Sequence, residues 1–241
     1  MINLLRSNMM RLRKFRAFKI EIICVFIMGI VTVFLEKMNE DSFTHPYGES
    51  YFQMIYMLLL VVSMIVGGYI SKDYVDNTIR NKISIGHKRL DIFIANHITT
   101  FYIYFLTVVT WTISYLFFGS FILNTDKIDK EALGVGIIVM LFAVISFSGI
   151  SVFFCMTVKN SFGGALTGAF FYVTMFVQIF EDIFDSKIFD FFIDFFPNLQ
   201  MAYLSPFECD EKPLLHIIYS IIIFVVSFAG GYRIFRKTDL N

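Results

Sequence analysis

Long apolar stretches alternate with short charged segments along the whole chain. A helix needs about 20 mostly apolar residues to cross the roughly 30 Å hydrocarbon core of a bilayer. Six stretches approach or exceed this length: residues 20–36, 51–70, 92–121, 132–158, 161–180 and 214–233. The pattern predicts an all-α membrane protein in which residues 1–241 form a single domain with six transmembrane helices.

Composition supports this class, because 57% of the residues are apolar and 31 of the 241 are phenylalanine. A water-soluble domain of this size does not bury so much apolar surface. The lipid membrane is therefore an expected partner, whereas nothing in the sequence indicates a nucleic-acid partner.

The distribution of basic residues predicts the orientation. Placing the N-terminus in the cytoplasm puts fifteen of the twenty Lys and Arg residues on the cytoplasmic side of the six spans. Basic residues are retained on that side of a membrane. We expect a multi-pass protein of the cell (plasma) membrane with both termini in the cytoplasm.

Residues 1–19 are basic and amphipathic, which predicts a helix lying in the inner membrane interface. Its lipid side would carry Ile2, Leu5, Met9 and Leu12, and its headgroup side would carry Arg6, Arg13 and Lys14. The alternative is a solvated basic tail.

The spans offer little catalytic chemistry. Residues 92–121, 132–158 and 161–180 contain no Asp or Glu, and the four histidines lie far apart in the sequence. Catalysis at membrane depth needs a nucleophile with a base, paired carboxylates or a metal. We therefore expect no enzyme activity and no metal or cofactor bound by this chain. Lys19 is expected to neutralise Glu21, and His97 is interpreted as a lone histidine reaching toward the interface.

The segment between the second and third spans, residues 71–91, holds five basic and three acidic residues. Tyr74, Ile79 and Ile83 follow a helical pattern there, and Gly86 predicts a turn before the next span. A short helix held between two spans can transmit a movement to those spans. The alternative is a solvated connector whose positive charge only fixes the topology.

Several residues of this segment occur in a recognisable order. Asp73 is followed by the sequence NTIRN at residues 77–81, then by Arg89, and the third span opens with the aromatic Phe93. This order resembles the membrane (permease) subunits of type-two ABC exporters. The sequence departs from that pattern at Asn77, where glycine is usual, and at Asn96, where a lysine commonly stands.

The resemblance implies a separate ABC ATPase subunit that binds the ATP and Mg, since this chain has no GxxxxGK[ST] loop. It also implies a second permease copy or a paralogue, and a cytoplasmic coupling helix that docks on the ATPase. Asp73 and Arg80 are expected to be docking contacts rather than contacts that hold the fold. The coupling residues would be Asp73, Tyr74, Thr78, Ile79, Arg80, Asn81 and Arg89.

Small residues recur in the fifth predicted span, where Gly164 and Gly168 lie four apart. Such spacing lets helix backbones approach closely in lipid. We interpret it as a helix-packing face, either within the chain or between two copies.

Residues 181–213 are expected outside the cell and contain an apolar face edged by acidic residues. The residues of this pattern are Phe184, Ile188, Phe191, Phe192, Phe195 and Phe196, with Glu181, Asp182, Asp185, Asp190 and Asp194. It predicts a re-entrant or interfacial helix ended by Pro197. By resemblance, Phe191, Phe192, Phe195 and Phe196 form an outer gate; the alternative is a helix that only anchors the outer edge.

The expected function is therefore that of the transmembrane subunit of an ATP-binding-cassette exporter. An acid-edged aromatic gate suits an apolar or amphipathic cargo, such as a hydrophobic or cationic peptide of the lantibiotic or toxin kind. Such export would give resistance to antimicrobial peptides. The alternatives are a non-transporting membrane sensor or scaffold and a stand-alone carrier.

Overall fold

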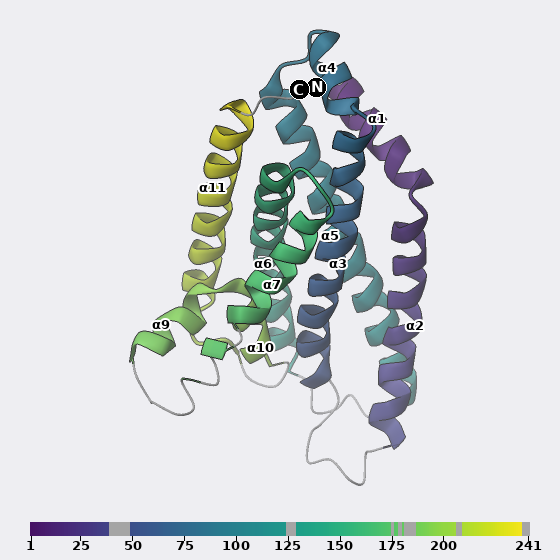
Figure 1. Cartoon of the computed structure of the whole chain (residues 1–241). Helices are drawn as coiled ribbons and strands as arrows, with labels where there is room; N and C mark the ends of the chain where they lie inside the picture. Colours follow the sequence, from purple (N-terminus) through teal and green to yellow (C-terminus); the bar gives the residue numbers. More distant parts are fainter. Residues whose placement is uncertain are drawn as a thin grey trace.

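The computed structural model of the chain is a bundle of α-helices (Figure 1). It describes residues 1–38, 49–123, 129–174, 176–177, 180, 187–205 and 209–237. In chain order the helices are α1 (Ile2–Lys14), α2 (Arg16–Met38), α3 (Glu49–Val75), α4 (Thr78–Ser84), α5 (Arg89–Ile122), α6 (Lys130–Val158), α7 (Phe162–Thr174), α9 (Lys187–Phe195), α10 (Pro197–Tyr203) and α11 (Pro213–Lys237).

Within the described part of the chain, five helices are long and apolar enough to cross a membrane: α2, α3, α5, α6 and α11. Each overlaps one predicted span and ends within a few residues of it. The prediction of an all-helical, multi-pass membrane protein is therefore confirmed.

The fifth predicted span, residues 161–180, is represented by α7, which has 13 residues. A helix of that length covers about 20 Å, less than the hydrocarbon thickness. Residues 175 and 178–179 of this predicted span lie outside the described residues. The described structure thus contains five candidate spans, and the sixth stays a prediction.

Helix α5 is the central helix of the bundle, since it packs against α1, α2, α3, α6 and α11. Several of its polar side chains find partners inside the protein, as membrane depth favours, although the ring nitrogens of His97 and the hydroxyl of Thr100 have none among the described residues. The indole nitrogen of Trp111 donates to the carbonyl of Tyr51 at 3.2 Å, and the hydroxyl of Tyr104 pairs with that of Ser151 at 2.6 Å. These bonds fix α5 against α3 and α6.

Helix α1 differs from the predicted interfacial helix in the face that it buries. Leu4, Asn8 and Leu12, spaced four apart, are buried in the protein, and α1 packs mainly on α5. The expectation that Leu12 faces lipid is wrong, because Leu12 is only 2% exposed. Asn8 finds polar partners among α3, α4 and α5, so this face turns toward the bundle.

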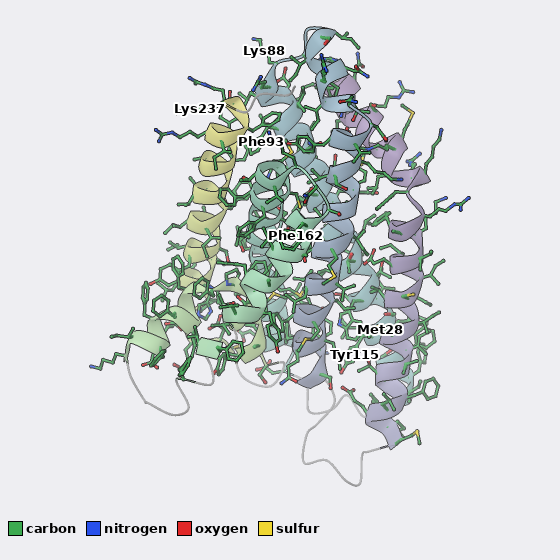
Figure 2. The ribbon with its side chains drawn as sticks, in the orientation of Figure 1. Met28, Lys88, Phe93, Tyr115, Phe162 and Lys237 are labelled. Atoms are coloured by element: carbon green, nitrogen blue, oxygen red, sulfur yellow. The ribbon has the colours of Figure 1, made fainter. Side chains whose placement is uncertain are left out.

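The two ends of the bundle carry different elements. One end, the α4 end, holds α4 with the start of α1 and the end of α11, and Figure 2 places Lys88 and Lys237 there. The other end, the α9 end, holds α9, α10 and the start of α11. Functional side chains gather at both ends.

Candidate functional site

Two residues outside the right-handed helical region of the backbone set the position of α4. Asn77 adopts a left-handed conformation with φ 52°, and Gly86 has φ 99°. Asparagine tolerates this region better than most residues, so Asn77 can adopt it without a glycine. The sharp turn at Asn77 separates α4 from α3, whereas the sequence predicted one helical pattern through Tyr74, Ile79 and Ile83. Gly86 reverses the chain toward α5, as the sequence predicted.

Asp73, in the last turn of α3, is the centre of a buried polar cluster. Its side chain is 0% exposed and forms an ion pair with Arg11 of α1. The ammonium of Lys82 lies 3.6 Å from the same carboxylate oxygen, which also accepts a hydrogen bond from the hydroxyl of Thr78. Burial excludes Asp73 from contact with a partner, so the expectation that it is a docking contact rather than a fold contact is wrong.

Electrostatics within this cluster depend on the single carboxylate. Burial opposes the charged form of Arg11, but the negative charge of Asp73 outweighs it, and the pKa of Arg11 lies above its usual value. For Lys82, burial disfavours the charged form more than the attraction of Asp73 favours it, so the pKa of Lys82 lies below its usual value. Two cations share one anion, which makes Asp73 indispensable to both.

Asn8 connects the cluster to the central helix. Its side-chain amide donates to the side-chain oxygen of Asn96 on α5 at 3.0 Å, and its side-chain oxygen accepts from Lys82 at 3.0 Å. Its backbone carbonyl accepts from the hydroxyl of Tyr69 on α3 at 2.9 Å. The guanidinium of Arg11 lies 4.1 Å above the ring of Tyr69. We name Asn8, Arg11, Tyr69, Asp73, Thr78, Lys82 and Asn96 the α4-end cluster.

Three further predicted coupling residues tie α4 and its flanks to the bundle. The hydroxyl of Tyr74 donates to the carbonyl of Met156 near the end of α6 at 3.1 Å. Ile79 is 1% exposed and belongs to the hydrophobic core. Arg89 donates to the carbonyls of Phe235 and Arg236, at 3.0 and 2.9 Å, and so caps the C-terminus of α11.

The remaining two predicted coupling residues, Arg80 and Asn81, lie on the outside of α4 and are exposed. Two large apolar residues flank them on the same end, Val75 at 73% exposed and Ile85 at 80% exposed. We name these four residues the α4 tip. A mixed apolar and polar surface of this kind, held from inside by Asp73, suits contact with another protein.

At the opposite end, the predicted gate residues divide into two pairs. Phe191 and Phe192 are exposed on α9, whereas Phe195 and Phe196 are half-buried and lie against an apolar groove between α7 and α11. Stacked rings join the pairs, Phe191 with Phe195 at 5.7 Å and Phe192 with Phe196 at 6.0 Å between centroids. The predicted partners Phe184, Glu181, Asp182 and Asp185 lie outside the described residues.

Next to these rings lies a second polar cluster that sequence reasoning missed. His216, in the first turn of α11, has one ring nitrogen 2.7 Å from Asp210 and the other 3.5 Å from Asp194 on α9. Lys212 lies 2.8 Å from the other oxygen of Asp194. We name these four residues the α9-end cluster. The only signal in the sequence was that Asp210, Lys212 and His216 lie close together, on both sides of Pro213.

The predicted packing glycine Gly164 lies at a close backbone contact between α7 and α3. A Cβ atom added to it would meet the carbonyl oxygen of Ser63 and, at 2.8 Å, the Cα of Gly67. A Cβ atom added to Gly168 would lie 3.3 Å from the hydroxyl oxygen of Ser63. Both glycines therefore serve packing within the chain.

Two ionisable residues at membrane depth differ from expectation. Glu21 is buried, and the hydroxyl of Thr107 on α5 donates to it at 2.7 Å. Lys19 is exposed, and among the described residues no ion pair joins it to Glu21. His97 is 5% exposed and packs against the rings of Phe93 and Phe228, so it does not reach the interface.

Figure 2 labels Phe93, the aromatic residue that opens the third predicted span, beside α11. Within the described part of the chain, no group of three or more His, Cys, Asp or Glu residues has the geometry of a metal site. Comparisons with protein-family models, with curated proteins and with solved structures gave no match to this chain.

Proposed function

We propose that this chain is the membrane subunit of an ATP-binding-cassette exporter of the second type and works with a separate ATPase subunit. One observation carries the proposal: a short helix projects from the end of the bundle, with Arg80 and Asn81 exposed and Asp73 fixed beneath it. A solvated connector needs neither a buried ion pair nor a buried Ile79.

The contacts of α4 supply a route by which force applied to it reaches the spans. Lys82 is bonded to Asn8, which is bonded in turn to Asn96 on α5. Asp73 joins α3 to α1 through Arg11, and Tyr74 joins α3 to the end of α6. A network of satisfied buried bonds moves as a unit more readily than it breaks. Displacement of α4 therefore shifts α1, α3, α5 and α6 together.

The proposed topology follows from charge. Fifteen of the twenty basic residues belong to segments on the α4 side, so the α4 end faces the cytoplasm and the α9 end faces the outside. In this arrangement α7 and the residues after it complete a sixth span, and both termini are cytoplasmic. The chain itself is not an enzyme: ATP and Mg belong to the partner ATPase, and a second permease copy or a paralogue completes the exporter.

The proposed cargo is apolar or amphipathic, such as a hydrophobic or cationic peptide. Support comes from the α9 end, where Phe195 and Phe196 line an apolar groove next to the acidic residue Asp194. A sugar or a metal ion would find no matching polar lining in that groove.

A stand-alone carrier is the second candidate, and Glu21 is the observation that favours it. A buried carboxyl at membrane depth is a common element of proton- and ion-coupled carriers. A carrier would transport without an ATPase, which separates the two candidates.

The test is to purify the chain in lipid with a candidate ABC ATPase and measure the hydrolysis that a peptide panel stimulates. The exporter proposal predicts co-purification and stimulated hydrolysis, both lost in the double variant Arg80→Ala, Asn81→Ala. The matched control is Ser84→Ala on the same helix, whose hydroxyl bonds only within α4. Transport that proceeds with no ATPase present would contradict the exporter and support the carrier.

A further inference from the structure

An apolar groove runs along the face of the bundle between α7 and α11, with α6 as its floor. Its volume is about 360 Å³, near the lower end of the range of small-molecule sites, which is about 300–1,000 Å³. Phe195 and Phe196 lie across its α9 end. We name it the α7–α11 groove; its lining is Ile150, Phe153, Phe154, Phe170, Phe195, Phe196, Ile222, Ile223, Val226, Ser227 and Gly230.

The lining of the groove offers no free hydrogen-bonding group. Ser227 supplies the only side-chain hydroxyl among the lining residues, and it donates to the carbonyl of Phe224 in its own helix at 2.9 Å. Gly230 leaves open space: a Cβ atom there would meet only the ring of Phe153, at 3.4 Å or more. The groove therefore accepts hydrocarbon and rejects polar groups.

The groove is long and is open to the surrounding lipid. Ile222 and Gly230 lie eight residues apart on α11, which corresponds to about 12 Å along the helix. Val226, on the same wall, is 65% exposed, and Ile222 is 44% exposed. A hydrocarbon chain lying in the bilayer can thus enter the groove from the side. The small volume of the groove suits one hydrocarbon chain rather than the paired chains of a phospholipid.

The groove itself has no charged lining residue, but a polar pocket beside its α9 end, lined by Asp194, Asp210, Glu211, Lys212 and His216, carries an excess of negative charge. Lys212 lies within electrostatic range of three carboxylates, those of Asp190, Asp194 and Glu211. Asp210 adds a fourth carboxylate, paired with His216. Lys212, His216 and, at the start of α9, Lys187 are at most three cations against these four anions, so the net charge favours a positive headgroup over a phosphate or a sulfate.

From this lining and this charge we propose that the α7–α11 groove is a binding site for a cationic amphiphile with a single hydrocarbon chain. The hydrocarbon chain of the amphiphile lies between α7 and α11, and its terminal carbons reach Gly230. The positive headgroup lies at the carboxylates beside α9. The site deepens the proposed export function by naming a cargo class. It rests on that function only for the direction of movement, because binding itself needs no ATPase.

The test uses the full chain in phosphatidylcholine nanodiscs without any ATPase. Hexadecyltrimethylammonium carrying a photoreactive diazirine in its chain is the probe, and hexadecyl sulfate with the same diazirine is the charge control. After irradiation, mass spectrometry locates the labelled peptides. We expect the cationic probe to label peptides with residues 150–154 and 222–230 several-fold more than the sulfate does.

Two variants fill the groove by different routes. Gly230→Leu extends a side chain along the floor, and Val226→Trp covers it from the lipid side. Each should lower labelling by roughly fourfold for every methylene displaced from the site. Gly134→Leu is the matched control, since Gly134 is exposed on α6, has no neighbour within 4 Å of an added Cβ and does not line the groove.

Equal labelling by the cationic and the sulfate probe would overturn the proposal and assign the groove to ordinary annular lipid. Labelling that both filling variants leave unchanged would overturn it as well. A positive result combined with no ATPase-dependent transport would support the binding site and contradict the proposed export function, so the two failures are distinguishable.

Discussion

Polar clusters lie at both ends of the bundle, but they are built differently. At the α4 end, Asp73 is 0% exposed and faces the fixed charges of Arg11 and Lys82. At the α9 end, the side chains of Asp194 and Lys212 are 21% and 50% exposed. Removing one partner of a buried pair leaves an uncompensated charge, whereas water replaces much of an exposed pair. We therefore expect the partners of Asp73 at the α4 end to resist separation more strongly than the Asp194–Lys212 pair at the α9 end.

The largest expected effect is that of Asp73→Ala, which would sharpen this contrast. It leaves the half-buried charges of Arg11 and Lys82 with no counter-ion and should destabilise the protein by about 3 kcal/mol, the lower end for a broken buried pair. Thermal unfolding in nanodiscs measures the loss, and Asp76→Ala, at an exposed position three residues on, is the control. If the Asp73 variant unfolds at the same temperature as the control variant, the ion pair of Asp73 does not stabilise the fold.

Asn8→Ala should have the next largest effect. It deprives the side chains of Lys82 and Asn96 of their partner, at a cost of about 1–3 kcal/mol. The nearby Asn3→Ala, on the exposed side of α1, should be close to neutral. Hydrogen exchange should quicken in both α1 and α4 in the Asn8 variant; a change confined to α1 would show that the cluster does not join the two helices.

A smaller effect is expected from His216→Ala at the α9 end. The change removes the bonds from α11 to Asp194, which is partly exposed, and to Asp210, which is nearly buried, at a cost of about 1 kcal/mol. Amide exchange in α9 should rise about fivefold, the ratio that corresponds to this energy. Exchange in α4 should stay constant, and a rise there would erase the difference between the two ends.

The smallest effect is expected when acid protonates Asp210 at the α9 end. Burial opposes the charged form of Asp210, but hydrogen bonds from His216 and from the backbone N–H of Lys212 outweigh it, so the pKa of Asp210 lies below its usual value. A lowered pKa contributes stability above the unfolded value, about 3.9, and that contribution is lost as the pH falls through the folded value. Spin labels at Ile188 and Leu214 should therefore report a broader α9–α11 distance in acid, once the pH lies below the folded value, than at neutral pH. An unchanged distance would mean that Asp210 does not hold α9.

How far the sequence predicted this molecule depends on the range of each interaction. The spans were predictable because an apolar run of the right length has few alternatives in lipid, and the turn that follows α4 was predictable from Gly86. The break between α3 and α4 at Asn77 was not predicted, because Tyr74, Ile79 and Ile83 follow one continuous helical pattern. The α4-end cluster was not, since Asn8 meets Asn96 across 88 positions of sequence. Asp73 was chosen as a coupling residue by order along the chain, and only packing against α1 shows that it is buried. The α9-end cluster was missed because α9 and α11 come together through tertiary structure.

We propose that the α4 tip, held from inside by Asp73, is the surface on which an ATPase docks. In a chain whose own cysteines are replaced, a single cysteine at residue 81 reports on that surface through its reaction with an impermeant maleimide in inside-out vesicles. The account predicts fast reaction without the ATPase, a decrease of about tenfold when the ATPase is bound, and no such decrease for a cysteine at residue 14, the exposed end of α1. Equal reaction rates at residue 81 with and without the bound ATPase would contradict it.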